Sequence, residues 1–288
     1  MLSILLLTAA VTLQPDFLVQ TSWLADHTAD SNVVVLDVTT LQGFAQGHIP
    51  NARRIDPKLL IVNRGRIPDE LPPIDRLEAL FTTAGIANAR RIIIYSRDPL
   101  LATRAFFTLD YLGYGDRIAI LDGGLQRWTA EKRPITREIS SPAAVPFQAV
   151  INHATLVNKA ELKDLISRNA VVLIDARPLA QVVGTERGKD IKRAGHIPSA
   201  KCLPWTANLQ PDENRIDVLK PEAGLRSMYA SFLPAGDEKI VVYCRTGMEG
   251  SMTYFVLRYL GYQPALYDGS FIEWNETEPV ARAAKVRS

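Results

Sequence analysis

The stretch that decides the fold is VVYCRTGMEGSM, residues 241–252, in which a β-rich run ends in a cysteine. After Cys244 come a basic residue, a hydroxyl and two glycines, and the chain then enters an apolar helical pattern. A strand that leads through a short loop into a helix holds its last residue near backbone N–H groups and the positive helix N-terminus. The stretch therefore predicts a nucleophilic thiol rather than a buried structural one, and we expect this setting to lower the pKa of Cys244.

The chain repeats this pattern once. GHIPNA (47–52) matches GHIPSA (195–200), IIIYSR (92–97) matches IVVYCR (240–245), and LDGGLQRW (121–128) matches YDGSFIEW (267–274). Matched blocks in the same order indicate two copies of one fold. Short apolar runs without alternation, separated by amphipathic helical stretches, are typical of strands buried in a parallel sheet. We predict an α/β fold twice over, each copy a parallel sheet flanked by helices.

The repeats set the domain boundaries. We predict an apolar N-terminal extension at 1–15, a first domain at 16–133, a linker at 134–154 and a second domain at 155–281. The linker segment is rich in proline and should run over the surface. Residues 1–13 are apolar and uncharged, which makes them a weak candidate for an export signal and leaves cytoplasm and periplasm both open.

Composition narrows the function classes. The chain has 288 residues and a net charge of +2, which indicates neither a nucleic-acid partner nor an anionic membrane. Two cysteines exclude a disulfide scaffold, and the few histidines, without a CxxC or HExxH motif, predict no metal site. Cys202 is predicted to be a small core residue that forms no bridge.

The two copies differ where chemistry is expected. The first has Ser96 at the position of Cys244. Between the strand-end aspartate and the GHIP histidine, the first copy has ten residues and the second has twenty. The longer loop carries five cations, and we predict that some of them form a local anion receptor; they are Arg177, Arg187, Lys189, Lys192 and Arg193. The second copy is therefore predicted to be the chemical one.

These motifs, in this order, resemble the tandem-domain rhodanese family of sulfurtransferases over nearly the whole chain. The resemblance implies two rhodanese-like domains, the first catalytically silent, with the active site in the cleft between them. It also implies that a cysteine takes sulfane sulfur from a donor, becomes a persulfide and passes the sulfur to a thiophilic acceptor. No cofactor or metal is implied beyond this covalent persulfide.

The resemblance assigns roles to particular residues. Cys244 is the expected nucleophile, and Arg177 in the DAR motif is the first choice for gripping the donor, with Arg187 second. The remaining substrate-binding positions are those of the loop: Arg245, Thr246, Gly247, Met248, Glu249 and Gly250. A carboxylate facing the sulfur would repel an anionic donor, so we expect Glu249 to point away from Cys244 and to pair with a nearby arginine.

The donor is predicted to be thiosulfate, with 3-mercaptopyruvate as the alternative. The loop keeps Arg245 of the thiosulfate enzymes but has Thr246 where the vertebrate type has a lysine. A persulfide carrier serving a partner protein stays possible. A cysteine phosphatase is disfavoured because Gly250 stands where the oxyanion-gripping arginine would be. Expected partners are a small sulfur donor and an acceptor such as cyanide, thioredoxin or another thiol, with the protein a monomer.

Three conspicuous polar residues are predicted to be structural. His48 matches a histidine for which a proton relay has been proposed in mercaptopyruvate enzymes, but the preceding loop has no carboxylate to complete it. We therefore expect both His48 and His196 to hold their loops by hydrogen bonds, and Asp175 to orient a backbone turn.

Overall fold

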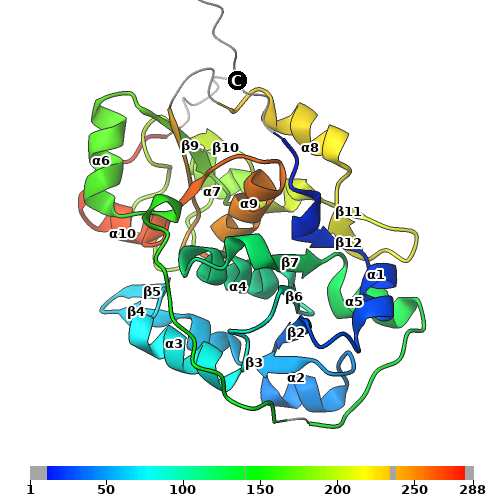
Figure 1. The fold of residues 1–288 in the computed structure, drawn as a ribbon. Helices are drawn as coiled ribbons and strands as arrows, with labels where there is room; N and C mark the ends of the chain where they lie inside the picture. The colour runs from blue at the N-terminus through cyan, green and yellow to red at the C-terminus, as the bar shows by residue number, and fades with distance from the viewer. Residues whose placement is uncertain (1–11, 140, 234–237, 283–288) are drawn as a thin grey trace, which may run out of the picture.

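The computed structural model describes residues 12–139, 141–233 and 238–282. Within them the chain forms two α/β halves, the first below and the second above in Figure 1, with α4 and α9 lying between them. The prediction of one fold in two copies is confirmed. Of the apolar segment 1–13, on which the export-signal hypothesis rests, residues 1–11 lie outside the described residues.

The first half is a five-stranded parallel sheet in the order β1-β7-β6-β2-β3, with a separate β4–β5 hairpin. Its elements are β1 (Leu18–Val19), α1 (Thr21–His27), β2 (Val33–Val38), α2 (Leu41–Gln46), β3 (Arg53–Ile55), β4 (Val62–Arg64), β5 (Ile67–Glu70), α3 (Ile74–Thr83), β6 (Arg91–Tyr95), α4 (Pro99–Tyr111), β7 (Ile118–Leu121) and α5 (Gly124–Ala130).

The second half repeats this topology, with strand order β10-β9-β13-β14-β8 and a β11–β12 hairpin in the place of β4–β5. Its elements are β8 (Leu156–Val157), α6 (Lys159–Ser167), β9 (Val171–Asp175), α7 (Leu179–Val183), β10 (Lys201–Cys202), β11 (Leu209–Pro211), β12 (Asp217–Leu219), α8 (Glu222–Tyr229), β13 (Lys239–Tyr243), α9 (Met248–Tyr259), β14 (Ala265–Tyr267) and α10 (Ser270–Thr277).

The sequence explains the central elements directly. In β6 and β13 every residue after the first is buried, as the unbroken apolar runs predicted. Helices α4 and α9 are also buried on most sides, because each packs on its own sheet and on the other helix. Each is followed by a glycine in the left-handed region, Gly113 (φ +88°) and Gly261 (φ +96°), a conformation that favours glycine and ends a helix.

The two copies meet about a pseudo-twofold axis between α4 and α9. Thr103 and Ser251 occupy equivalent positions, and their hydroxyl oxygens lie 3.0 Å apart. Asp110 and Arg258 are also equivalent, and they form an ion pair of 2.8 Å. Two matched edge-to-face ring pairs complete the interface: Phe106 with Phe255 and Phe107 with Tyr254. Because equivalent residues contact one another along both helices, the copies form one packed unit.

The linker predicted at 134–154 follows the first domain rather than spanning open space, and it passes around the lower half in Figure 1. Thr136 pairs with His48 as an isolated β-bridge, just as Ala281 pairs with His196 in the second copy. Farther along, Phe147 packs between aromatic rings of the first domain. Among the described residues, no helix is long and apolar enough to cross a bilayer.

Candidate active site

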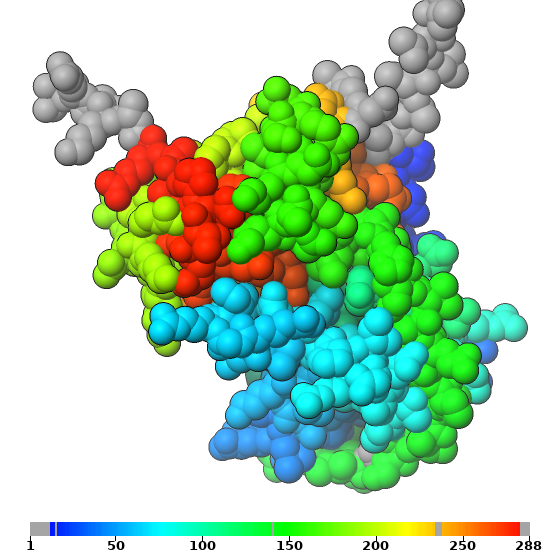
Figure 2. Space-filling view, turned by 90° about the vertical axis from the view of Figure 1, so that its left-hand side faces the viewer, coloured from blue at the N-terminus to red at the C-terminus, as the bar shows by residue number. Residues whose placement is uncertain are grey.

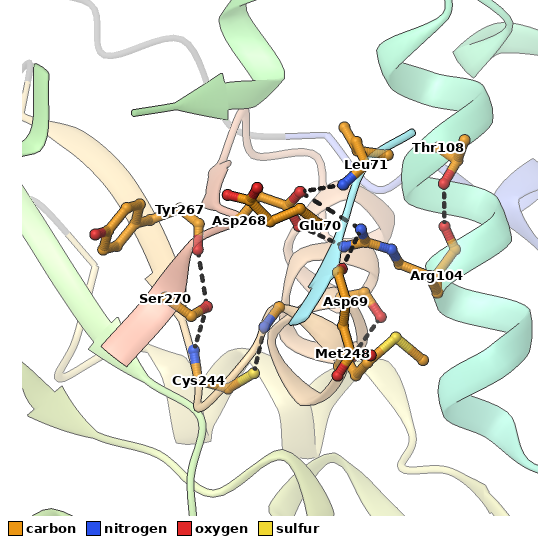
Figure 3. A network of polar contacts seen from close by, with 12 residues as sticks. Asp69, Glu70, Leu71, Arg104, Thr108, Cys244, Met248, Tyr267, Asp268 and Ser270 are labelled. Carbon is orange, nitrogen blue, oxygen red and sulfur yellow. Dashed lines mark hydrogen bonds and ion pairs between the residues drawn. The ribbon is translucent and has the colours of Figure 1, made fainter. Parts of the chain in front are cut away.

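Cys244 directly follows β13, at the carboxyl edge of the second sheet, and its side chain is fully buried. Gly247, with φ +93°, turns the chain into α9 and caps it without a side-chain hydrogen bond. Its backbone N–H donates to Cys244 Sγ over 3.1 Å (Figure 3). Backbone N–H groups of Thr246 and Gly250 also hydrogen-bond the sulfur. The predicted bed of amides beneath the thiol is therefore present.

The loop is anchored from the start of α10. Ser270 Oγ accepts a hydrogen bond from the Cys244 backbone N–H (3.3 Å) and donates to the Tyr267 carbonyl oxygen (2.8 Å), as Figure 3 shows. The Phe271 N–H in turn donates to the Cys244 carbonyl (3.0 Å). Sequence reasoning missed Ser270. The comparison of YDGS with LDGG contained the signal, because the first copy has glycine, Gly124, at this position.

The prediction that this setting lowers the pKa of Cys244 is wrong. Burial and the nearby Glu249 carboxylate raise the pKa of Cys244 to about 12, and the amides of Gly250, Thr246 and Gly247 offset only part of that rise. The loop amides do act as predicted, but desolvation of the thiolate in a closed cleft outweighs them. In this state the resting form of the residue is therefore the thiol.

The expectation that Glu249 points away from the sulfur is also wrong. Its carboxylate accepts hydrogen bonds from the Cys244 thiol and from the Arg245 backbone N–H. Burial raises the pKa of Glu249, while these hydrogen bonds and the Arg245 charge act in the opposite direction. A carboxylate that touches the thiol is placed to accept its proton, because no solvent reaches the sulfur.

The equivalent loop of the first copy cannot offer the same site. Ser96 Oγ donates to the Val38 carbonyl (2.7 Å), so the hydroxyl is held against its own sheet. Pro99, in the place of Gly247, has no N–H to donate. Asp98 caps α4 by accepting the Leu100 N–H (2.9 Å), which puts a negative charge at the helix N-terminus. The loop of the first copy therefore differs from that of the second in three separate ways.

Arg177 is held by partners within its own domain. Its guanidinium is 1% exposed, forms an ion pair of 2.6 Å with Asp175 and donates to the Gly195 carbonyl (2.9 Å). It also stacks on Phe271, 3.8 Å from the ring centroid. The prediction that Arg177 grips the donor is therefore corrected: it fixes the base of the inserted loop. Asp175 orients the turn as predicted, accepting the Arg177 N–H at 3.1 Å.

The other cations of the inserted loop separate into two groups. Lys192 pairs with Glu276, and Arg193 donates to carbonyls of Asn275 and Glu278, which together fasten the loop to α10. Arg187 and Lys189 are exposed and have no ion pair within the described chain. Of the five cations of the inserted loop, Arg187 and Lys189 therefore remain the candidates for binding an anion.

Within the catalytic loop itself, Arg245 is half-buried and likewise forms no ion pair with a described residue. Thr246 is buried, and Met248 begins α9 half-buried, its carbonyl accepting the Ser251 hydroxyl at 2.6 Å. A Cβ at Gly250 would lie 2.9 Å from the Leu266 Cδ1 atom, so a side chain there would require Leu266 to shift.

A clamp from the first domain closes over the loop, and nothing in the sequence analysis anticipated it. Arg104 of α4 forms an ion pair of 2.6 Å with Asp268 and donates to the Asp69 carbonyl (2.7 Å). Asp268 also accepts the Leu71 N–H at 2.6 Å (Figure 3). A Cβ at Gly247 would meet Asp268 Oδ1 at 2.7 Å and Arg104 Nη1 at 3.2 Å. The clamp thus presses on the residue whose amide contacts the sulfur.

The clamp is part of a larger domain contact. Residue Ile67 of the β4–β5 hairpin packs against the core of the second domain. In the space-filling view of Figure 2, this hairpin reaches from the first domain to the surface of α10. The β4–β5 hairpin therefore joins Arg104 in linking the first domain to the second.

The predicted structural roles of the histidines are confirmed. His48 contacts the carbonyls of Phe44 (2.9 Å) and Glu138 (3.1 Å), and His196 contacts that of Val182 (2.8 Å). Cys202 forms no bridge, as expected, but it is half-buried at the sheet edge rather than in the core, because β10 is an edge strand. In the described ranges no group of three His, Cys, Asp or Glu side chains is arranged to hold a metal ion.

Comparison with known proteins identifies the fold. The Rhodanese-like domain family model matches residues 20–131 and 158–277. The crystal structure of SseA from Escherichia coli, whose title names the rhodanese fold of 3-mercaptopyruvate sulfotransferases, superposes with a TM-score of 0.76 at 26% identity and covers 88% of this chain and 98% of that one. The chain belongs to the rhodanese family and has two rhodanese-like domains in tandem.

The curated relatives are sulfurtransferases and a sulfur carrier. Thiosulfate sulfurtransferase of Azotobacter vinelandii is 30% identical over 84% of this chain and 88% of its own length. The sulfur carrier protein TtuD of Thermus thermophilus is 32% identical over 90% and 94%. The 3-mercaptopyruvate sulfurtransferase of Escherichia coli is 26% identical over 88% and 92%. The protein is accordingly a sulfurtransferase of the tandem-domain type.

Proposed function

We propose that the protein transfers sulfane sulfur from thiosulfate to a thiophilic acceptor through a persulfide on Cys244. The observation that carries the proposal is the difference between the two loops: only the second has a thiol contacted by a free amide, Gly247 N–H, at the start of a long helix. In the first loop Ser96 replaces the thiol, Pro99 has no N–H to donate, and Asp98 puts a negative charge at the helix N-terminus. Sulfur chemistry is therefore assigned to one copy.

The reaction runs in two displacements. Cys244 loses its proton to the adjacent Glu249 carboxylate, and the thiolate attacks the outer sulfur of thiosulfate. The sulfur–sulfur bond of the donor breaks, and sulfite leaves with the bonding electron pair. The acceptor, cyanide or a thiol such as that of thioredoxin, then attacks the terminal sulfur, and Cys244 leaves as thiolate. No cofactor takes part, because the persulfide itself carries the sulfur.

The amide nest stabilises each anionic state of this cycle. The N–H groups of Thr246, Gly247 and Gly250 are aligned with the helix N-terminus, where negative charge is favoured. Oriented dipoles of this kind stabilise a charge without reorganising during the reaction. The donor's sulfonate group would meet Arg245 in the loop and Arg187 or Lys189 on the inserted loop. Arg187 and Lys189 form no ion pair with a described residue, whereas Arg245 also acts on the Glu249 carboxylate.

Thiosulfate is preferred over 3-mercaptopyruvate because the histidine of the proposed relay is occupied. His48 is 1% exposed, stacks on Phe44, and has both ring nitrogens against carbonyl oxygens of its own domain. It therefore has no free position from which to pass a proton to a mercaptopyruvate carbonyl.

The test is thiocyanate formation with each donor, together with mass spectrometry of the protein after donor alone. Cys244→Ser should abolish turnover and the gain of one sulfur atom, whereas the matched control Cys202→Ser should retain both. Activity that survives in Cys244→Ser refutes the assignment of the nucleophile. A kcat/KM for 3-mercaptopyruvate at least tenfold above that for thiosulfate would reverse the order of donors.

A carrier function is the second candidate, favoured by the likeness to TtuD and by the complete burial of Cys244. A buried persulfide is protected from stray thiols until a partner opens the cleft. Transfer of sulfur from the loaded protein to a purified protein thiol, at a rate well above transfer to free cysteine, would support this role over small-molecule turnover.

A further inference from the structure

The pseudo-twofold axis relates the catalytic loop to a second region that no sulfur chemistry uses. A cavity of about 300 Å³ lies between the silent loop of the first domain and the β11–β12 hairpin of the second. In Figure 1 this hairpin stands beside α5 and β7, away from β4–β5 and α10. The cavity lies beside the Ser96 loop of the first domain, at the position equivalent to that of the clamp beside the Cys244 loop of the second domain.

The cavity exists because the clamp is missing on this side. On the catalytic side, Arg104 fills the space beside Gly247 and pairs with Asp268. The residue equivalent to Arg104 is Met252, which lines the cavity and ends short of Asp122, the equivalent of Asp268. Asp122 instead pairs within its own domain with Arg127 (2.9 Å) and accepts the Leu219 N–H (3.0 Å). The substitution of one arginine by methionine thus leaves an open space.

The cavity is lined by both apolar and charged side chains. The apolar ones include Leu18, Ile120, Leu209, Met252 and Phe255. At the mouth stand Arg97 and Arg215, both exposed and both without an ion pair to any described residue. Asp217, also exposed, is the one unpaired carboxylate among the described lining residues. The unpaired charges therefore leave a single net positive charge.

We propose that this cavity binds a small organic monoanion, a carboxylate or sulfonate with an apolar body. The body lies against Met252 and Phe255, where burial of apolar surface drives binding. The anionic end lies between the guanidiniums of Arg97 and Arg215, which match carboxylate and sulfonate oxygens. A dianion is disfavoured because Asp217 is in the same mouth. Binding is non-covalent, since the Ser96 hydroxyl is committed to the Val38 carbonyl.

The test compares two probes of the same shape and different charge, phenylacetate and the neutral 2-phenylethanol, by calorimetry on the full chain. Phenylacetate should bind with one site per chain. The double variant Arg97→Gln/Arg215→Gln should weaken phenylacetate by roughly fivefold or more, the scale of two exposed ion pairs, and leave 2-phenylethanol unchanged. Thiosulfate, a dianion, should not displace phenylacetate.

A second variant tests the cavity rather than the charges. Met252→Arg rebuilds the clamp toward Asp122 and should abolish binding of both probes, whereas the matched Met252→Leu keeps the apolar wall and should retain it. Thermal unfolding shows whether Met252→Arg is folded. If this variant does not fold, the Arg97→Gln/Arg215→Gln variant decides whether the cavity binds phenylacetate. Phenylacetate binding that is unchanged in the double variant, absent from the wild type, or displaced by thiosulfate overturns the proposal.

Discussion

The clamp gives the sharpest prediction, because the chain contains two interdomain Arg–Asp pairs of similar burial. Arg104–Asp268 (2.6 Å) joins α4 to the segment between β14 and α10 beside Gly247, and Arg258–Asp110 (2.8 Å) joins α9 to α4. Removing one partner of a buried pair leaves an uncompensated charge and costs about 3–5 kcal/mol. Arg104→Met and Arg258→Met should therefore destabilise the protein by similar amounts in denaturant unfolding.

The two variants should differ in chemistry. In Arg104→Met, the unpaired Asp268 carboxylate stays beside Gly247, the residue whose N–H donates to Cys244 Sγ over 3.1 Å. A misplacement of about 1 Å at a reacting group can cost up to ~100-fold in rate, so we expect kcat for thiocyanate formation to fall roughly 10- to 100-fold. Arg258→Met should stay within about threefold, because its pair touches no residue of the loop.

The assay that separates positioning from stability is the pH dependence of Cys244 alkylation by iodoacetamide. The added negative charge in Arg104→Met should raise the pKa of the thiol further and move the alkylation profile to higher pH, and Arg104→Lys should restore part of the loss. Equal kcat and equal alkylation profiles in Arg104→Met and Arg258→Met would refute the reasoning and leave the clamp a purely structural contact.

Three further predictions follow from the corrected site. Glu249→Gln removes a carboxylate that raises the pKa of Cys244, so its alkylation profile should move to lower pH, while thiocyanate turnover falls because the proton acceptor is lost; a profile that does not move places the carboxylate elsewhere. Burial raises the pKa of Asp37, in β2, to about 6, so the folded state holds the proton more tightly than the unfolded one, and stability should fall by on the order of 3 kcal/mol as the pH rises from about 4 to 6. Asp37→Asn should flatten that part of the unfolding curve, and an unchanged slope contradicts the assignment. Arg187→Gln should raise KM for thiosulfate by a fewfold without changing stability, because the side chain is exposed and unpaired; a loss of stability would show that it packs.

Internal comparison explains why the sequence was informative about the fold. The repeat of GHIP, the β-rich run and the DG motif indicated two copies, and the unbroken apolar runs indicated parallel strands. Both inferences depend on local patterns, which follow from side-chain burial along one element. The contrast between Ser96 and Cys244 likewise predicts the nucleophile, because it compares equivalent positions within one chain.

The same local reasoning misplaced the charges. Arg177 and Glu249 were assigned from their positions in motifs, but whether a side chain faces a cleft depends on which partner is nearer. Asp175, two residues from Arg177, forms an ion pair with the Arg177 guanidinium, and both side chains are buried. Glu249 turns toward the sulfur because the Cys244 thiol and the Arg245 N–H both donate to it.

By itself the sequence determined the internal repeat and the α/β class, and it predicted that the second copy and Cys244 carry the chemistry. Only the tertiary structure shows that burial and the Glu249 carboxylate raise the pKa of Cys244. The tertiary structure also brought Arg104 and Asp69 to Asp268 from distant parts of the chain. The tertiary structure also shows a cavity at Met252, in the position equivalent to the space that Arg104 fills. Such contacts depend on how the two copies dock, and no local pattern encodes that geometry. The VVYCRTGMEGSM stretch predicts the nucleophile, and the tertiary structure places the Arg104–Asp268 ion pair beside Gly247 of the same loop.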